Sequence, residues 1–254
     1  MKLKKWLALA AAGVLAAAVA AGCGNEQSKV LRVGSETTFA PFEFVDDNNK
    51  YVGFDVELAE ALAKEMGYEK SEIVSMGFDA LIPALQSKNI DMIAAGMVIT
   101  PERQEKVFFS DSYYDSGLVI VVRKDDDQIH DVPDLAGKTL GAQLGTTGSF
   151  FAKEQPNAVV KEMDTINQLF LELGNKGMDA MILDKPVAQY WMKQGAGKDF
   201  KIVGPMVKSN KLGLAVRKDD KQLQEKLNKA LKTLRENGVY DQLYEKWFGE
   251  KPAK

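Results

Sequence analysis

The sequence contains little cysteine, little histidine and few long apolar segments. Cys23 is the only cysteine and His130 the only histidine among 254 residues. A single cysteine excludes a disulfide bond within the chain. One unbroken apolar run covers residues 6–21, and no second run of that kind follows it. The remainder of the chain is therefore not expected to contribute a membrane span of its own.

The apolar run has the features of an export signal. Lys2, Lys4 and Lys5 precede it, and small residues end it just before Cys23. A basic segment, an apolar segment and a small-residue cleavage site are typical of a secretory signal peptide. The run is too short, and too closely followed by polar residues, for a transmembrane helix. The sequence therefore predicts a signal peptide over residues 1–22 and an exported mature protein.

Cys23 is a candidate site of lipid attachment. Small residues followed by cysteine at the end of a signal resemble a bacterial lipobox, although Ala20 stands where lipoboxes usually carry leucine. This pattern predicts cleavage before Cys23 and a lipid on its sulfur. The lipid would hold the protein in the periplasm or at the outer face of the cytoplasmic membrane, with residues 23–29 as a polar tether.

The remaining composition is that of an ordinary globular protein. It is 45% hydrophobic and 27% charged, and 254 residues are enough for two folded lobes. The formal net charge is −3, and loss of the three leader lysines lowers it to −6. A mildly acidic mature protein argues against nucleic acid as a partner. We predict no metal site and no cofactor.

The stretch from residue 89 to residue 103 organises the expected fold. Residues 92–95 form a predicted buried strand, and Thr100 and Pro101 are a typical N-cap and first position of a helix. Ligands of open α/β sheets sit beyond the carboxyl ends of strands, so this arrangement offers Arg103 a small anion such as a carboxylate. Taken alone, Arg103 would be assigned as a solvated first-turn residue.

The second half of the chain repeats this pattern, which changes that assignment. Three pairs of residues differ by the same 88 positions: Leu85 and Leu173, Lys88 and Lys176, Asp91 and Asp179. In both copies a predicted helix, a tight turn, an aspartate and a buried strand follow one another. The sequence therefore predicts an α/β fold of two related lobes.

The two copies differ where the strand ends. Gly96 in the first copy corresponds to Asp184 in the second, again 88 positions later. A buried carboxylate is costly unless it is paired, so Asp184 is predicted to bind a cationic group of a ligand. The alternative is that Asp184 caps the helix beginning at Pro186, which is a common role of aspartate and is compatible with the first.

The loop after the first strand, residues 30–35, brings an acid and aromatic residues together. Glu36, Phe39 and Phe42 all lie in it, and loops after parallel strands often carry function. Core packing is the alternative for aromatic residues, and we accept it for Phe42. Phe39 lies in mid-loop and is predicted to contact a ligand, as is Phe78 at the start of a later helix.

A closing helix over residues 240–248 carries a second aromatic group. Tyr244, Trp247 and Phe248 could form a platform for a sugar. Their helical spacing beside the C-terminus instead favours packing on the first lobe.

Together these features predict a ligand site between the lobes. Arg103 would bind a carboxylate, helped by backbone N–H groups near Val98 and at Thr147, and Asp184 would bind an ammonium group. Removing one partner of such a desolvated pair typically costs about 2–5 kcal/mol. A carboxylate and an ammonium group together describe a zwitterion. A ligand that contacts both lobes stabilises the closed form.

The chain resembles the polar amino-acid-binding proteins of bacterial ABC transporters, which are solute-binding proteins of family 3. The glutamine-, histidine- and lysine/arginine/ornithine-binding members are the most similar. The segments that carry the resemblance are TFAPFEF (38–44), VGFDV (52–56), LIPALQ (81–86), ITPER (99–103), FSDSYY (109–114) and LKTLRENG (231–238). The resemblance covers essentially the whole mature chain.

The resemblance implies a two-lobe periplasmic-binding-protein-like (type II) fold. Lobe 1 would comprise residues 30–120 and 212–254, and lobe 2 residues 121–211. Two hinge strands would join them, near residues 120–123 and 206–212.

The resemblance also implies a set of ligand-binding residues. These are Glu36, Phe39, Phe78, Ala95, Gly96, Val98, Arg103, Gln143, Thr147 and Asp184. Arg103 would take the α-carboxylate and Asp184 the α-ammonium group, with backbone contacts from Gly96 and Thr147. Phe39 and Phe78 would sandwich the ligand side chain, and Glu36 would contact its far end.

Three departures from the family pattern bear on the ligand. Glu36 stands where these proteins usually carry aspartate, and Val98 replaces a usual serine or threonine. Gln143 stands where glutamine-binding members carry a lysine that neutralises the acid. Without that lysine, Glu36 is free to pair with a cation, which favours arginine or lysine over glutamine. Phe39 and Phe78 suit a flat guanidinium group by cation–π contact.

Two other functions are alternatives to a receptor. An exported cyclohexadienyl-type dehydratase on this scaffold would need a general acid, for which Glu36 is the candidate. The aromatic residues beside Glu36 favour recognition, and His130 lies in a polar loop, so no enzyme is expected. A ligand-sensing module would need a separate membrane receptor. We expect a monomer that delivers a polar amino acid to an ABC transporter permease.

Overall fold

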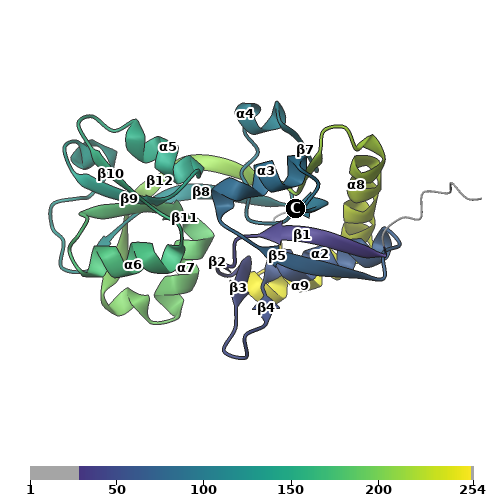
Figure 1. The fold of residues 1–254 in the computed structure, drawn as a ribbon. Coiled ribbons are helices and arrows are strands. Elements are labelled where there is room, and N and C mark those ends of the chain that lie inside the picture. The colour runs from purple at the N-terminus through teal and green to yellow at the C-terminus, as the bar shows by residue number, and fades with distance from the viewer. Residues whose placement is uncertain (1–28, 253–254) are drawn as a thin grey trace, which may run out of the picture.

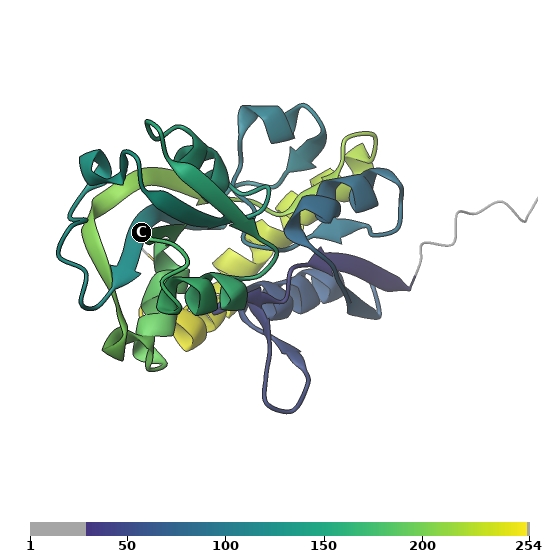
Figure 2. The same ribbon diagram turned by 60° about the vertical axis from the view of Figure 1, so that its left-hand side comes forward.

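The computed structural model describes residues 29–252. The predicted signal peptide and Cys23 lie outside the described residues, so they stay predictions. Two lobes stand side by side, and the strands β8 and β12 run between them (Figures 1 and 2). Among residues 29–252, no helix combines the length and apolar character needed to cross a membrane.

Lobe 1 is built on a five-stranded sheet of order β5-β1-β6-β13-β7. Its strands are β1 (Val30–Ser35), β5 (Lys70–Ser75), β6 (Met92–Ile93), β7 (Val107–Phe109) and β13 (Ala215–Arg217), and its helices are α2 (Phe54–Glu65), α3 (Leu81–Gln86), α4 (Pro101–Gln104), α8 (Lys221–Glu236) and α9 (Val239–Phe248). A 3₁₀ turn, η1 (Phe78–Ala80), leads into α3. A small sheet of β2 (Thr38–Phe39), β3 (Glu43–Val45) and β4 (Tyr51–Val52) contacts α2.

The sheet of lobe 1 is covered on both faces. β1 pairs in parallel with β5 and β6, and β13 is antiparallel to β6 and β7. Successive side chains of a strand point to opposite faces, so Met92 packs with Leu58 of α2 and Leu227 of α8, while Ile93 packs with Leu85 of α3. Two-sided burial explains why the central strand β6 is entirely apolar, whereas the edge strand β5 is partly polar and exposed.

Lobe 2 repeats this plan with a sheet of order β10-β9-β11-β8-β12. Its strands are β8 (Tyr114–Arg123), β9 (Thr139–Gln143), β10 (Val159–Met163), β11 (Ala180–Asp184) and β12 (Phe200–Leu212); its helices are α5 (Thr147–Lys153), α6 (Ile166–Gly174) and α7 (Lys185–Lys193), with 3₁₀ turns η2 (Val132–Leu135) and η3 (Ala196–Lys198). β9, β10 and β11 run in parallel, and β8 is antiparallel to both β11 and β12.

The strands β8 and β12 connect the lobes as a paired ribbon. Residues 118–122 of β8 pair with β11 inside the sheet of lobe 2, whereas residues 114–117 pair with β12 alone. This pairing favours a first crossing at residues 114–117, on the N-terminal side of the range 120–123 expected from the sequence. The boundaries given for the lobes stay a prediction.

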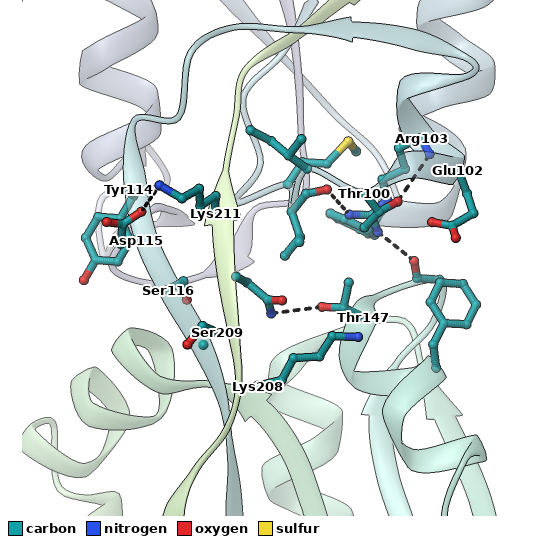
Figure 3. Close-up of a pocket in the computed structure, with 18 of the residues that line it drawn as sticks. Thr100, Glu102, Arg103, Tyr114, Asp115, Ser116, Thr147, Lys208, Ser209 and Lys211 are labelled. Carbon is teal, nitrogen blue, oxygen red and sulfur yellow. Dashed lines mark hydrogen bonds and ion pairs between the residues drawn. The ribbon is translucent and has the colours of Figure 1, made fainter.

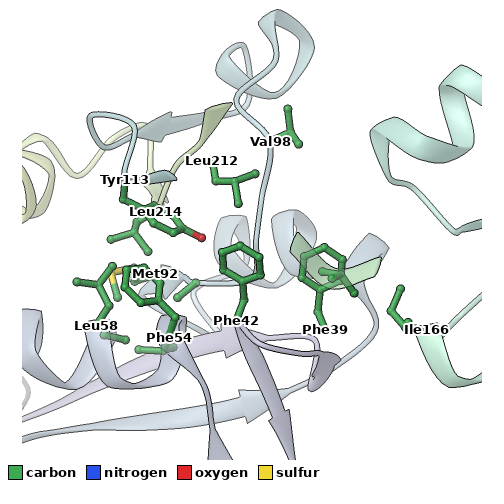
Figure 4. Close-up of a cluster of buried hydrophobic side chains, with 14 of the residues drawn as sticks. Phe39, Phe42, Phe54, Leu58, Met92, Val98, Tyr113, Ile166, Leu212 and Leu214 are labelled. Atoms are coloured by element: carbon green, nitrogen blue, oxygen red, sulfur yellow. The ribbon is translucent and has the colours of Figure 1, made fainter. Parts of the chain in front are cut away.

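The aromatic residues of the closing helix pack into lobe 1. Phe248 lies 5.2 Å from Phe54 and 4.7 Å from Tyr114, measured between ring centroids, and Trp247 meets Phe44 edge-on. This is the core packing expected from their spacing. Phe42, fully buried, continues the same cluster toward Phe39, which lies at its edge close to α6 of lobe 2 (Figure 4).

Candidate functional site

A small buried pocket lies between the lobes and gathers the whole predicted set of ligand-binding residues. Its lining comprises Glu36, Phe39, Phe78, Ala95, Gly96, Val98, Arg103, Gln143, Thr147 and Asp184, together with Glu43 and Thr146, which the sequence reasoning did not single out. The pocket encloses about 10 Å³ of free space, room for about one water molecule. A larger ligand can therefore enter only when the lobes move apart.

Arg103 is positioned by the helix start that the sequence predicts. Thr100 caps α4 by accepting a hydrogen bond from the Arg103 backbone N–H at 3.3 Å, and Pro101 is the first residue of the helix. The guanidinium group donates to the carbonyl of Val98 at 2.7 Å and to that of Gly145 in lobe 2 at 3.0 Å. The alternative of a solvated Arg103 is wrong, since only 8% of the residue is exposed.

The charge of Arg103 persists in this buried place. Burial lowers the pKa of its guanidinium to about 10, while the negative charge of Asp184 opposes that shift. The group is therefore cationic at neutral pH. Its ring neighbour is Phe78, whose centroid lies 5.1 Å from the guanidinium carbon. A guanidinium carries five N–H donors, so donors beyond those bound to Val98 and Gly145 are left for an anion.

Asp184 ends β11 and faces the pocket from lobe 2. It occupies the N-cap position of α7, but its side chain makes no capping hydrogen bond, so the capping alternative is wrong. Its Oδ1 instead accepts from the Ser116 hydroxyl on β8 at 2.9 Å. Burial raises the pKa of Asp184 to about 6, and the positive charge of Arg103 limits the rise. The carboxylate is mainly ionised at neutral pH and is partnered by one neutral donor.

Gly96 occupies the equivalent place in lobe 1 with backbone alone. Its φ is +51°, in the left-handed region that favours glycine. A Cβ at this position would lie 2.5 Å from the ring of Phe39. The Gly96 N–H donates to Oδ2 of Asp55 at 2.9 Å. Glycine is therefore required both by the backbone turn and by the ring that covers it.

Glu36 lines the pocket and joins the lobes through a hydrogen bond. Its carboxylate accepts from the Thr38 hydroxyl, at 2.9 Å to Oε1, and from Gln143 Nε2 of lobe 2, at 3.0 Å to Oε2. Gln143 also donates to the Asp164 carbonyl at 3.0 Å, which fixes its amide. Burial raises the pKa of Glu36, and these donors counter the rise.

A second, larger cavity opens beside the pocket. It measures about 1550 Å³ and runs along β8 and β12 between the lobes (Figure 3). Phe78, Val98, Arg103 and Thr147 line both cavities. Asn210 of β12 donates to the Thr147 hydroxyl at 3.5 Å. Thr147 is the first residue of α5, where backbone N–H groups have no partner within the helix.

The pocket thus brings together a cation from lobe 1 and an anion from lobe 2, with a further acid, Glu36, in its lining. The carboxylate of a zwitterion would match Arg103, and its ammonium group would match Asp184. The sequence reasoning missed Glu43 and Ser116. Glu43 is a lone acid between two phenylalanines in a short strand, which is the only local signal of burial it offers. Nothing local to Ser116 points to Asp184.

Known proteins match the chain over most of its length. The family model described as "Bacterial extracellular solute-binding proteins, family 3" matches residues 31–250. The "Arginine-binding extracellular protein ArtP" of Bacillus subtilis (strain 168) is 40% identical in an alignment of 260 positions, which covers 98% of this chain and 100% of the relative. The "Histidine-binding periplasmic protein" of Salmonella typhimurium (strain LT2) is 35% identical over 253 residues, 96% of this chain and 97% of the relative.

Solved structures match the fold as well. "An ancestral arginine-binding protein bound to arginine" has a TM-score of 0.84 and 46% identity, covering 87% of this chain and 99% of the other. "An ancestral arginine-binding protein bound to glutamine" has a TM-score of 0.85 and 46% identity, covering 89% of this chain and 100% of the other. The "ancestral amino acid-binding protein AncCDT-1, a precursor of cyclohexadienyl dehydratase" has a TM-score of 0.80 and 42% identity, covering 87% of this chain and 96% of the other. The predicted two-lobe type II fold is confirmed.

Proposed function

The chain belongs to the bacterial extracellular solute-binding proteins of family 3, and from that premise we propose that it is the arginine receptor of an ABC importer. Arginine-binding relatives and neighbours support the choice of ligand. Lysine is the second choice, and glutamine the third, because one matched structure holds glutamine.

In this proposal the ends of the two matching strands bind the ligand backbone. Arg103 takes the α-carboxylate, assisted by the backbone N–H of Thr147 and by backbone N–H groups near Val98. Asp184 takes the α-ammonium group. Charge-assisted hydrogen bonds of this kind are shorter and stronger than neutral ones, so both ends of the zwitterion are fixed.

One observation carries the choice of a cationic side chain. Glu36 is only 4% exposed, and within the described residues its hydrogen-bond donors Thr38 and Gln143 are both uncharged. A buried carboxylate without a counter-charge is costly. The guanidinium of arginine would supply that charge, with Phe39 and Phe78 beside its flat face. Glutamine would supply only an amide.

Ligand binding would be coupled to closure because the same groups also join the lobes. The hydrogen bonds that cross between the lobes include Arg103 to the Gly145 carbonyl, Gln143 to Glu36, and the Ile166 N–H to the Thr38 hydroxyl at 3.2 Å. An amino acid between Arg103 and Asp184 adds to them only in the closed form. It therefore shifts the population toward that form.

Isothermal titration calorimetry tests the ligand directly. We expect arginine to bind with a Kd of about 1 μM, corresponding to roughly −8 kcal/mol. Lysine, histidine, glutamine and glutamate should bind more weakly, in an order led by lysine. Tighter binding of glutamine than of arginine would overturn the ligand choice, and no binding of any of them would overturn the receptor.

We propose a receptor rather than an enzyme. A dehydratase would need a group that donates a proton to the substrate, whereas Glu36 is held as an acceptor by Thr38 and Gln143. Incubation with prephenate or arogenate should leave either compound unchanged, and measurable turnover would support the enzyme. A ligand sensor is distinguished from an importer by arginine uptake in cells that lack this chain, which should fall.

We also propose a lipid anchor on Cys23 and a monomeric state. The lipobox-like segment before Cys23 supports the anchor. A clickable fatty-acid analogue should label the full chain in cells, and Cys23→Ser should abolish the label and release the protein into the medium. Light scattering of the mature chain should give the mass of one copy, with and without arginine.

A further inference from the structure

A pair of buried acids is not used by the proposed contacts: Glu43, which lines the ligand pocket, and Asp55, which binds the N–H of Gly96. Glu43 on β3 and Asp55 in the first turn of α2 are both fully buried. Three of their carboxyl oxygens, both of Glu43 and Oδ1 of Asp55, have no hydrogen-bond partner among the described residues. Buried polar atoms are nearly always bonded, so three orphaned oxygens on two neighbouring acids require an explanation.

The second carboxyl oxygen of Asp55, Oδ2, accepts two hydrogen bonds. The donors are the Gly96 N–H at 2.9 Å and the Tyr113 hydroxyl at 2.6 Å. Tyr113 is itself held, because its carbonyl accepts a hydrogen bond from the Tyr240 hydroxyl. Asp55 therefore ties the left-handed turn at Gly96, which faces the ligand pocket, to the core of lobe 1.

Within residues 29–252, Glu43 has no cation beside it. The charged groups that face it are Asp55 on α2, Glu36 after β1 and Asp184 at the end of β11, all acids. Arg103, which lines the same pocket, donates to Val98 and Gly145 instead. Burial and these negative neighbours raise the pKa of Glu43 well above its usual range. Burial raises the pKa of Asp55 to about 6, and its two donors limit the rise.

We propose that Glu43 is a protonated carboxylic acid that donates its proton to the free oxygen of Asp55, and that it positions Gly96 in the ligand pocket through Asp55. One proton then satisfies an orphaned oxygen on each acid. It also leaves Asp55 ionised and able to accept from Gly96 and Tyr113. Glu43 is a positioning residue in this arrangement, because it acts through Asp55.

The arrangement also bears on specificity, and this part rests on the proposed function. With Glu43 neutral, Asp184 and Glu36 are the ionised acids that line the pocket. Asp184 matches an α-ammonium group, so Glu36 alone remains for the side chain. The pocket is thus balanced for an amino acid with one side-chain cation. With Glu43 ionised it would carry one buried negative charge too many.

The same chemical change at two positions tests the proposal. Glu43→Gln replaces a neutral acid by a neutral amide that can still donate to Asp55, so arginine affinity should stay within about threefold of the parent. Glu36→Gln is the matched control: it removes the ionised acid of the same pocket, and arginine affinity should fall about 30-fold or more. Glu43→Ala removes the donor and should weaken binding by about tenfold. A loss in Glu43→Gln as large as in Glu36→Gln would overturn the proposal, since Glu43 would then be a charged ligand contact.

An infrared spectrum without ligand gives an independent reading. At pH 7 the parent should show the carbonyl stretch of a protonated carboxylic acid, which Glu36→Gln should retain and Glu43→Gln should lose. Absence of the band from the parent, or its survival in Glu43→Gln, would overturn the proposal. If the parent bound no amino acid, the proposed function would fail, but this band would still decide the protonation state of Glu43.

Discussion

The two lobes share one local structure, a left-handed turn at a lysine followed by an aspartate and a buried strand, which we call the frame. They differ in the residues that follow this frame. Lys88 and Lys176 both adopt left-handed backbone, with φ of 64° and 62°. The N–H of each donates to the carbonyl three residues earlier, that of Leu85 or Leu173, at 3.2 Å. Asp91 and Asp179 then each accept from the backbone N–H of a residue on the neighbouring strand, Arg32 or Thr139. The internal repeat seen in the sequence is therefore also a repeat of hydrogen bonds.

The functional difference begins directly after this frame. In lobe 1 the strand is followed by Gly96, which contributes backbone, and by Arg103 on the next helix. In lobe 2 the strand ends on Asp184, a carboxylate. Because the lobes face each other, Arg103 on the helix after one strand and Asp184 at the end of the equivalent strand bring opposite charges to one pocket. Two similar lobes thus form a pocket whose two sides differ in charge.

The largest expected effect comes from removing the cation of lobe 1. Arg103→Ala should weaken arginine binding by about 2–5 kcal/mol, since it leaves the ligand carboxylate unpaired in a desolvated site. Calorimetry measures the loss, and circular dichroism should show an intact fold. Arg103→Lys is the control: it keeps the charge but not the fork of donors, so it should fall between the parent and alanine. Near-normal affinity of the alanine variant would contradict the clamp.

Removing the anion of lobe 2 should weaken binding but increase stability. Asp184→Asn should lower arginine affinity about 100-fold. The folded pKa of Asp184, about 6, lies above its usual value. The stability tied to this proton is thus fully present below the unfolded pKa and is lost as pH rises through about 6. Asparagine does not ionise, so the variant keeps this stability at pH 7. Without ligand it should therefore melt at a higher temperature than the parent at that pH.

The same titration should appear in ligand binding. An α-ammonium group needs the ionised form of Asp184, so arginine affinity of the parent should fall as pH drops below about 6. The residual affinity of Asp184→Asn should show a weaker pH dependence over that range. An equally steep dependence in both proteins would place the titrating group elsewhere.

A smaller effect is expected at the backbone end in lobe 1. Gly96→Ala introduces a Cβ 2.5 Å from Phe39 at a φ of +51°. A left-handed residue with a side chain costs roughly 1–2 kcal/mol, and displacement of Phe39 adds to it. Both arginine affinity and the free energy of unfolding should fall. Gly67→Ala is the control, because its φ is +88° but no atom lies within 4 Å of the added Cβ. Equal effects of the two substitutions would show that the ring contact is unimportant.

The smallest effect tests the likeness of the lobes. Lys88→Gly and Lys176→Gly relieve left-handed backbone at exposed, matched positions. The strain energy removed exceeds the entropic cost of glycine flexibility by about 0.5–1 kcal/mol, so the free energy of unfolding rises. Each variant should therefore unfold at slightly higher urea concentration. Arginine affinity should not change. Opposite signs in the two lobes would mean that the frames are not equivalent.

Much of the site was predictable because its signals are local. The cap at Thr100 with Pro101 set the start of α4, and the repeat placed Gly96 and Asp184 at equivalent strand ends. Each depends on residues close together in the chain. The expected hinge near residues 120–123 stays a prediction, because that apolar run is equally suited to the middle of a sheet, where β11 and β12 pair with it.

Other parts of the site depend on contacts between distant residues. The ring of Phe78 also lies against Arg103, a contact that depends on how η1 and α4 pack. The Glu36–Gln143 bond joins residues 107 positions apart. Such pairs join residues far apart in the sequence, so no local pattern reports them.

The sequence by itself determined the fold class, the repeat and the kinds of charge available at the strand ends. These follow from periodicity, caps and residue types, which act over a few positions. Only the tertiary structure decided which acids are paired, which stay without a cation, and that the acids facing Glu43 include Asp55, which binds Gly96. Burial and charge pairing depend on every element that packs around a group, and those elements come from both halves of the chain.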